Sequence, residues 1–142
     1  MKGAVLGLDV GSVRIGVAVC EGDGLPAVPL CTITSASREK DVKAVVELAA
    51  VRNARTLVVG YPVKLDGSHG PAAANMDKFI TALKKSFDGE VAAVDERLTT
   101  AAAHRKLLDT GLSGSRRRAM VDRMAAVEIL EGWLAQHRRS GR

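Results

Sequence analysis

The chain has 142 residues, of which 46% are hydrophobic and 26% are charged, a composition that is typical of one folded domain and excludes a disordered chain. No apolar run approaches the roughly 20 residues that a membrane-spanning helix needs, and Asp9 and Arg14 interrupt the first apolar stretch, so we expect a cytoplasmic protein without a signal peptide. The net charge of +5 is compatible with a polyanionic partner, whereas an aromatic content of 3% argues against a platform of aromatic side chains that stack bases.

Three short, closely linked strands are predicted in the first part of the chain. Residues 3–9 and 14–20 are rich in Val, Leu and Ile, and a tight turn through residues 10–12 joins them. A second turn near residues 22–26 leads to a third strand over residues 28–33. We expect these strands to form an antiparallel meander.

Helices and strands alternate in the rest of the chain. In chain order we predict a helix over 38–53, a strand over 56–60, a loop over 61–70, a helix over 71–87, a strand over 91–94, a helix from Thr99 or Thr100 to Thr110, a basic connection over 113–118 and a last helix over 119–136. Strands separated by helices require parallel pairing. The pattern therefore predicts an α/β fold, a mixed sheet with helices on its faces, in a single domain over residues 1–142.

Asp9 is the unusual residue of the first strand. It ends an apolar run and precedes the turn at Gly11, where an Asp side chain readily accepts hydrogen bonds from turn amides. A carboxylate in this place is either a turn cap or a functional group, and the residues around it favour the cap.

Asp122 lies on an apolar face of the last predicted helix. At 100° per residue it shares that face with Ala125, Ala126, Ile129 and Trp133, the face best suited to pack on the sheet. A charge there needs a partner, which a metal ion or a neighbouring Arg could provide. The alternative is an acid that interacts with the helix dipole in the early turns.

More acids follow the fifth predicted strand, in the sequence VDERLTT over residues 94–100. The carboxyl ends of parallel strands form the usual ligand-binding edge of an α/β sheet. Asp95 and Glu96 are adjacent, so they point to opposite sides of an extended chain. Alternation from Val94 does not decide which of the two enters a site, and an exposed loop with an ion pair to Arg97 is the alternative.

Four sequence motifs, in this order, carry a resemblance to a known family. LDVGSVRIGVAV, GYPVKLDGS, VDERLTT and VDRMAAVEIL together resemble the YqgF/RuvX proteins, described as candidate pre-16S rRNA nucleases and Holliday junction resolvases. The resemblance covers essentially the whole chain. It implies an RNase H-like fold, with a five-stranded mixed sheet in the order 3-2-1-4-5 flanked by helices.

The resemblance also implies an acidic active site. Asp9, Glu96 and Asp122 match the acidic positions of the family, with Asp95 as the competitor of Glu96. Carboxylate oxygens suit Mg²⁺ or Mn²⁺, and two such ions could activate water and stabilise the leaving oxygen in phosphodiester cleavage. We expect the three carboxyl groups to lie close enough together to share these ions.

Basic residues near these acids are candidates for holding nucleic acid. They are Arg14, Lys64, Arg97, Arg116, Arg117 and Arg118. Contacts with phosphates would position a substrate without reading its sequence. The alternatives are an ion pair between Arg14 and Asp9, and a solvated linker for the Arg run. His69 and His104 are kept out of the catalytic set because surface or capping roles are commoner for such residues.

The predicted function is metal-dependent cleavage of structured nucleic acid, and the resemblance favours 5′-end maturation of pre-16S rRNA. Resolution of branched DNA is the alternative, and a resolvase should act as a symmetric homodimer because it cuts two strands. The residues do not choose between the two substrates. A non-catalytic nucleic-acid-binding module is a further alternative, which the presence of all three acids opposes. Phosphotransferases with a similar first motif are opposed by length, because they build two such domains around a nucleotide.

Overall fold

The computed structural model describes residues 3–62, 70–96 and 114–139. Within them, one five-stranded sheet has the order β3-β2-β1-β4-β5. The strands are β1 (Ala4–Val10), β2 (Arg14–Cys20), β3 (Val28–Thr34), β4 (Ala54–Tyr61) and β5 (Glu90–Asp95). The β1–β2 and β2–β3 pairs are antiparallel, and the β1–β4 and β4–β5 pairs are parallel. The expected α/β class, mixed sheet and strand order are confirmed.

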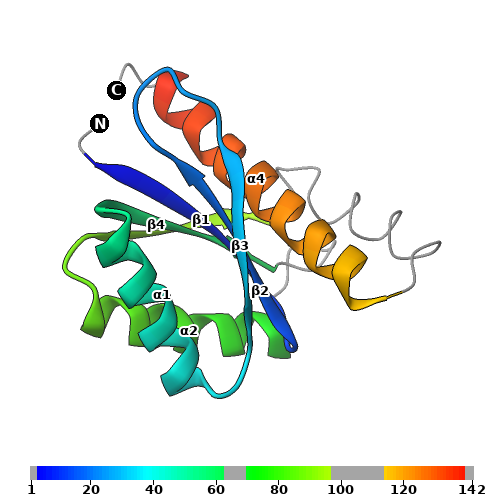
Figure 1. Ribbon diagram of the computed structural model, residues 1–142. Helices are drawn as coiled ribbons and strands as arrows, with labels where there is room; N and C mark the ends of the chain where they lie inside the picture. Colours follow the sequence, from blue (N-terminus) through cyan, green and yellow to red (C-terminus); the bar gives the residue numbers. More distant parts are fainter. Residues whose placement is uncertain (1–2, 63–69, 97–113, 140–142) are drawn as a thin grey trace.

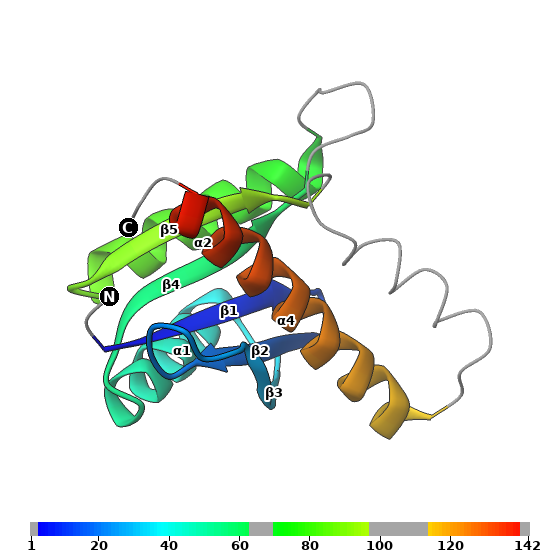
Figure 2. The same cartoon turned by 90° about the horizontal axis from the view of Figure 1, so that it is seen from above.

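Helices cover both faces of this sheet (Figure 1). The helices α1 (Arg38–Val51) and α2 (Pro71–Ser86) lie together on one face, and the long helix α4 (Ser115–Arg139) crosses the other. Figure 2 shows α4 running obliquely over β1 and β2. None of the described helices has both the length and the apolar character to cross a bilayer.

Each face of the sheet buries its own hydrophobic core, because side chains alternate between the faces along every strand. Leu6, Leu8 and Val17 point toward α1 and α2, where Val45 and Leu83 complete that core. The opposite core lies beneath α4 and contains Val5, Ala18, Val58, Val94, Ala126, Ile129 and Leu130. The alternation therefore decides which β1 side chains face α4, and Asp9 is one of them.

Helix α1 ends two residues earlier than its sequence pattern predicts. The helix stops at Val51, and Asn53 adopts a φ of 55°, in the left-handed region where a helix cannot continue. Asn reaches this region more easily than most residues. Strand β4 then begins at Ala54, so the helix and the strand are joined by a two-residue turn.

The predicted boundary before the last helix is wrong. Residues 113–118 were expected to form a basic connection, but α4 begins at Ser115 and takes the three arginines of that segment into its first turn. The N–H of Arg118 donates to the Gly114 carbonyl at 3.3 Å, and Gly114 has a φ of 93°. Arg is a good helix former, so the helix extends until glycine stops it. The helix predicted from Thr99 or Thr100 to Thr110 lies outside the described residues.

Candidate active site

Asp9 is buried on the α4 face of the sheet, near the end of β1. It shares that face with Val5 and Gly7, and its side chain is only 3% exposed. Directly across the antiparallel pair it faces Gly16 of β2. A carboxylate this deeply buried costs free energy unless other groups compensate its charge, so this position is typical of a functional or tightly bonded acid rather than a solvated turn cap.

Asp122 forms an ion pair with Arg14. The Arg14 Nε donates to the Asp122 Oδ2 at 2.7 Å, and the two side chains are 23% and 14% exposed. Asp122 comes from the second turn of α4, and Arg14 is the first residue of β2. Of the two partners expected for Asp122, a metal ion or a neighbouring Arg, the structure contains the Arg: the Arg14 guanidinium on β2 reaches the carboxylate on α4.

Strand glycines allow α4 to approach the sheet around these acids. A Cβ at Gly16 would lie 2.1 Å from the Asp122 carbonyl oxygen, and a Cβ at Gly7 would lie 2.7 Å from the Leu130 Cβ. No side chain fits in either place, so α4 rests directly on the backbone of β1 and β2. Glycine inside a strand is the sequence signal of such an approach, and by this signal Gly7 and Gly16 are recognisable as positions where a helix could contact the sheet.

Glu96 follows β5 and lies on the Asp9 side of the sheet edge. A Cβ at Gly60 would come within 3.0 Å of the Glu96 Oε1. The β1–β4 register pairs Leu8 with Val59, so the next residues along these parallel strands, Asp9 and Gly60, are lateral neighbours. The Glu96 carboxylate is thus held against the glycine beside Asp9. Val94 faces α4, so strand alternation directs Asp95 to the opposite face.

The expected grouping of Asp9, Glu96 and Asp122 around a metal ion stays a prediction. Within residues 3–62, 70–96 and 114–139, no three His, Cys, Asp or Glu side chains are grouped so that they could hold a metal ion. The carboxylate oxygens of Asp9, Glu96 and Asp122 are suitable ligands for Mg²⁺ or Mn²⁺. The Asp122 carboxylate, however, forms an ion pair with the Arg14 guanidinium. The role of the three acids as metal ligands stays a prediction.

A second polar contact fastens α4 to the edge strand β3. The Arg123 Nη1 donates to the Thr32 Oγ1 at 3.0 Å, and the Thr32 hydroxyl donates to the Ala119 carbonyl at 3.2 Å. Burial raises the pKa of the neighbouring Cys31 thiol, and the positive charge of Arg123 partly offsets that rise. Asp122 therefore lies between two anchor points, Arg14 on β2 and Thr32 on β3.

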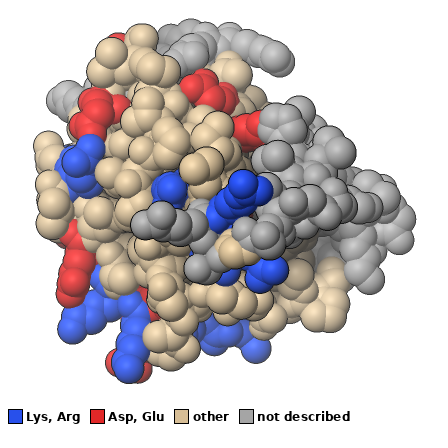
Figure 3. Space-filling view, turned by 45° about the vertical axis from the view of Figure 1, so that its right-hand side comes forward, with Lys and Arg blue, Asp and Glu red and all other residues tan. Residues whose placement is uncertain are grey.

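The other predicted basic residues are only partly described. Arg117 and Arg118 are exposed in the first turn of α4, close in sequence to Asp122. Lys64 and Arg97 lie outside the described residues, as do His69 and His104, and of Arg116 only the helical backbone is described. Figure 3 shows Lys and Arg side chains in several separate places on one face, interspersed with acids.

Comparisons with known proteins agree with the fold and the motifs. Residues 3–136 match the family model described as "RuvX: Holliday junction resolvase". A "Putative pre-16S rRNA nuclease" of Clostridium perfringens is 42% identical over 130 residues, 92% of this chain and 95% of the relative. A protein of the same name from Myxococcus xanthus is 42% identical over 94% of this chain and 88% of the relative.

Solved structures show the same architecture at much lower identity. RuvC of T. thermophilus, in a complex with a Holliday junction substrate, superposes with a TM-score of 0.57 at 14% identity, over 94% of this chain and 96% of that chain. The fowlpox virus Holliday junction resolvase superposes with a TM-score of 0.50 at 12% identity, over 87% of this chain and 93% of that chain. These two similarities concern the fold alone.

Proposed function

The chain belongs to the RuvX family, and from this membership and the acidic edge of the sheet we propose that it is a metal-dependent nuclease that cleaves phosphodiester bonds in structured nucleic acid. The observation that carries the proposal is the buried Asp9, with the Glu96 carboxylate held against the neighbouring Gly60. Two acids at the carboxyl end of parallel strands stand where α/β proteins bind ligands. Asp122 is the third acid of the proposed site.

Asp9, Glu96 and Asp122 are the residues that would hold Mg²⁺ or Mn²⁺. Such ions, two of them in the mechanism we favour, would supply an activated water and stabilise charge on the leaving oxygen. Arg14 forms a 2.7 Å ion pair with the Asp122 carboxylate and compensates its charge in the absence of metal, so that Arg14 and a metal ion would compete for this carboxylate. Because the Glu96 carboxylate lies against Gly60, we assign the ligand role to Glu96 rather than Asp95.

Arg117 and Arg118 are proposed to contact phosphates beside the site. They are exposed in the first turn of the helix that carries Asp122, and a guanidinium binds phosphate strongly without regard to sequence. Lys64, Arg97 and Arg116 keep the same proposed role on the sequence alone. Contacts of this kind weaken as the salt concentration rises.

Precursor 16S rRNA is the substrate we favour, because curated relatives 42% identical to this chain bear the name of pre-16S rRNA nucleases. Resolution of branched DNA is the second candidate, since the matching family model is described as a Holliday junction resolvase. A resolvase would need a symmetric homodimer, because two strands are cut.

The test compares substrates, metals and variants in one assay. Purified protein is incubated with Mg²⁺ or Mn²⁺ and a precursor rRNA fragment, a four-way DNA junction or a linear duplex. Asp9→Asn and Asp122→Asn should abolish cleavage, whereas Asp88→Asn, which changes an exposed carboxylate just beyond α2, should retain it. Thermal unfolding of each variant checks that the fold is intact.

Each outcome decides a different part of the proposal. Cleavage that persists in both acidic-site variants would remove the acid cluster from the mechanism, and cleavage that persists after chelation would remove the metal. If only the RNA is cleaved, resolution of branched DNA is rejected as the function. If only the junction is cleaved, maturation of pre-16S rRNA is rejected. Specific binding without cleavage under any of these conditions would point to a non-catalytic module.

A further inference from the structure

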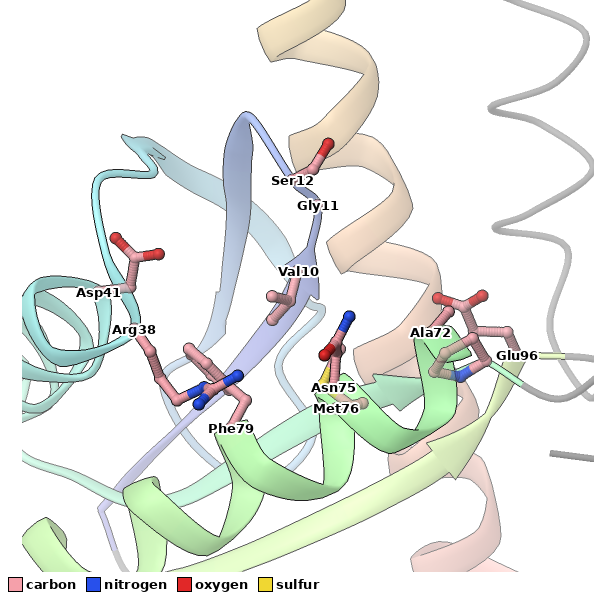
Figure 4. Close-up of a pocket in the computed structure, with 11 residues that line it drawn as sticks. Val10, Gly11, Ser12, Arg38, Asp41, Ala72, Asn75, Met76, Phe79 and Glu96 are labelled. Carbon is pink, nitrogen blue, oxygen red and sulfur yellow. The ribbon is translucent and has the colours of Figure 1, made fainter. Parts of the chain in front are cut away.

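A second feature of the same sheet edge is a pocket of about 410 Å³, which lies mainly on the α1 and α2 side of the sheet and reaches the edge at Glu96. It opens between the β1–β2 turn, the start of α1 and the first half of α2 (Figure 4). Arg38 lies at one end of the pocket and Glu96 at the other. Its volume is within the about 300–1,000 Å³ that is typical of small-molecule sites.

The lining of this pocket is apolar at the bottom and polar at the mouth. Val10, Met76 and Phe79 are lining residues that also pack in the hydrophobic core, where Met76 and Phe79 are only 7% and 5% exposed. Asn75 and Arg38 are exposed lining residues with hydrogen-bond donors, and Asn75 also offers an acceptor. A flat, apolar ring with polar edges fits such a lining.

The acidic lining residue Asp41 is already used by the fold. Its Oδ2 accepts from the Ser35 hydroxyl at 2.6 Å, and its Oδ1 accepts from the Ala36 N–H at 2.9 Å. Apart from Asp41, Glu96 is the acidic residue among those that line the pocket, and it lies at the end of the pocket away from Arg38, so the rest of the lining does not favour a cation. Its cationic end, at Arg38, suits a ligand that carries an anionic group next to its ring.

We propose that this pocket binds one unpaired nucleotide of the substrate strand, next to the bond that is cut. The base packs on Met76 and Phe79, the Asn75 amide bonds to its edge, and Arg38 contacts a phosphate. Because a paired base is enclosed in its stack, the pocket selects single-stranded or splayed nucleotides. A pocket for one base is compatible with a low aromatic content, which excludes only a platform for many bases.

Glu96 connects this inference to the proposed nuclease site. It lines the pocket, and its carboxylate lies against Gly60 beside Asp9. A nucleotide in the pocket would thus place its neighbouring phosphodiester near the acids. The placement of the nucleotide next to the bond that is cut rests on the proposed nuclease function. Binding of the nucleotide to the pocket can be measured without any cleavage.

The first experiment follows the methionine methyl groups by NMR. The chain has four methionines. Met76 lines the pocket, whereas Met120 and Met124 are 57% and 44% exposed on α4 and serve as internal controls. Met76→Leu, a volume-conserving change, assigns the Met76 signal. The probes are AMP, UMP, a short single-stranded RNA, a blunt RNA duplex and ribose 5-phosphate, all without divalent metal.

We expect the single-stranded RNA and the nucleoside monophosphates to shift the Met76 methyl signal saturably, with tighter binding for the RNA. Ribose 5-phosphate and the duplex should leave it in place. An unmoved Met76 signal with every probe, or an equal shift with ribose 5-phosphate, would overturn the inference. A shift with mononucleotides but not with RNA would also overturn it, because the pocket would then belong to a free nucleotide.

The second experiment closes the pocket with a matched pair of variants. Ala72 and Ala74 are both exposed on α2, but only Ala72 lines the pocket. Ala72→Phe should weaken binding of single-stranded RNA about tenfold, as expected for loss of a stacked base, while Ala74→Phe should leave it unchanged. Equal affinity for the two variants would contradict the inference. Both measurements record RNA binding and do not depend on nuclease activity. The absence of cleavage would therefore count against the proposed function, and the absence of nucleotide binding would count against the pocket inference.

Discussion

Gly16 of β2 lies directly against the backbone of Asp122, so that a Cβ at Gly16 would be 2.1 Å from the Asp122 carbonyl oxygen. The approach sets how deeply the N-terminal half of α4 sits on the sheet. Arg14, two residues before Gly16 and on the same face of β2, then reaches the Asp122 carboxylate at 2.7 Å. The glycine therefore determines the position of the acid and of its partner.

Gly16→Ala should displace α4, because backbone atoms of a packed helix cannot make room for the methyl group. We expect the free energy of unfolding to fall by about 1–3 kcal/mol and cleavage to fall with it, as the Asp122 carboxylate moves. Urea-induced unfolding followed by Trp133 fluorescence measures the stability. Gly22→Ala is the control, since its Cβ would make only an ordinary 3.8 Å contact; equal losses in both variants would contradict the close-approach argument.

Arg14→Gln should strengthen metal binding. The substitution removes a positive charge that competes for the Asp122 carboxylate but keeps a hydrogen-bond donor. For a partly exposed pair, the expected effect is about two- to fivefold tighter Mn²⁺ binding, measured by calorimetry without nucleic acid. Arg52→Gln is the control, because it alters the exposed Arg52–Glu21 ion pair elsewhere. Weaker binding in Arg14→Gln would instead mean that Arg14 holds Asp122 in its ligand position.

Asp41→Ala should destabilise the connection between β3 and α1. Asp41 is 7% exposed and accepts from the Ser35 hydroxyl and the Ala36 N–H. Its removal deprives the half-buried Ser35 hydroxyl and the exposed Ala36 N–H of a charged acceptor, and the loss of these two hydrogen bonds should cost about 1–3 kcal/mol. Chemical denaturation of this variant is compared with that of Glu39→Ala, which removes an exposed acid from the same helix. Indistinguishable midpoints would show that the two hydrogen bonds contribute nothing to stability.

Tyr61 should ionise at a higher pH than a free tyrosine. Its hydroxyl donates to the Asp77 Oδ1 at 2.8 Å, and this hydrogen bond, with smaller contributions from burial and from the Asp77 charge, raises the pKa of Tyr61 above 10.0. Because the folded-state pKa is raised, the contact stabilises the fold below pH 10.0, and that contribution is lost as pH rises through the higher folded value.

The chain has one tyrosine, so the ultraviolet absorbance of tyrosinate reports Tyr61 alone. Asp77→Ala should move the midpoint down toward the ordinary value, whereas Asp88→Ala, at an exposed acid beyond the same helix, should not. A midpoint that is the same in all three proteins would show that the hydrogen bond does not form in solution.

Several features of the site were predicted from local sequence patterns. Asp122 was placed on the sheet-facing side of its helix, and the neighbours chosen with it, Ala125, Ala126, Ile129 and Trp133, are all buried. Helical periodicity is sufficient for this, because each turn repeats the same orientation toward the core. The Asp9 position at the end of an apolar strand was visible for the same reason.

Other features depended on residues far apart in the chain. From the sequence, Asp9 was the nearby acid considered as a partner for Arg14. In the structure Arg14 pairs with Asp122, which lies 108 positions away in the chain. The close packing of α4 on Gly16 and the Glu96 carboxylate over Gly60 also bring together separate elements. Local periodicity has no information on such distances, although the glycines within β1, β2 and β4 are a signal that could have been used.

By itself, the sequence determined the order and type of the described elements, the faces that they bury and the four motifs of the family, because strand alternation and helical periodicity are local properties of the chain. Only the tertiary structure decided which acid of VDERLTT lies beside Gly60, which cation holds Asp122, and that a pocket shares Glu96 with the acidic edge. Those relationships follow from how closely α2 and α4 pack on opposite faces of one sheet, and packing distances are set by side chains that meet across the fold.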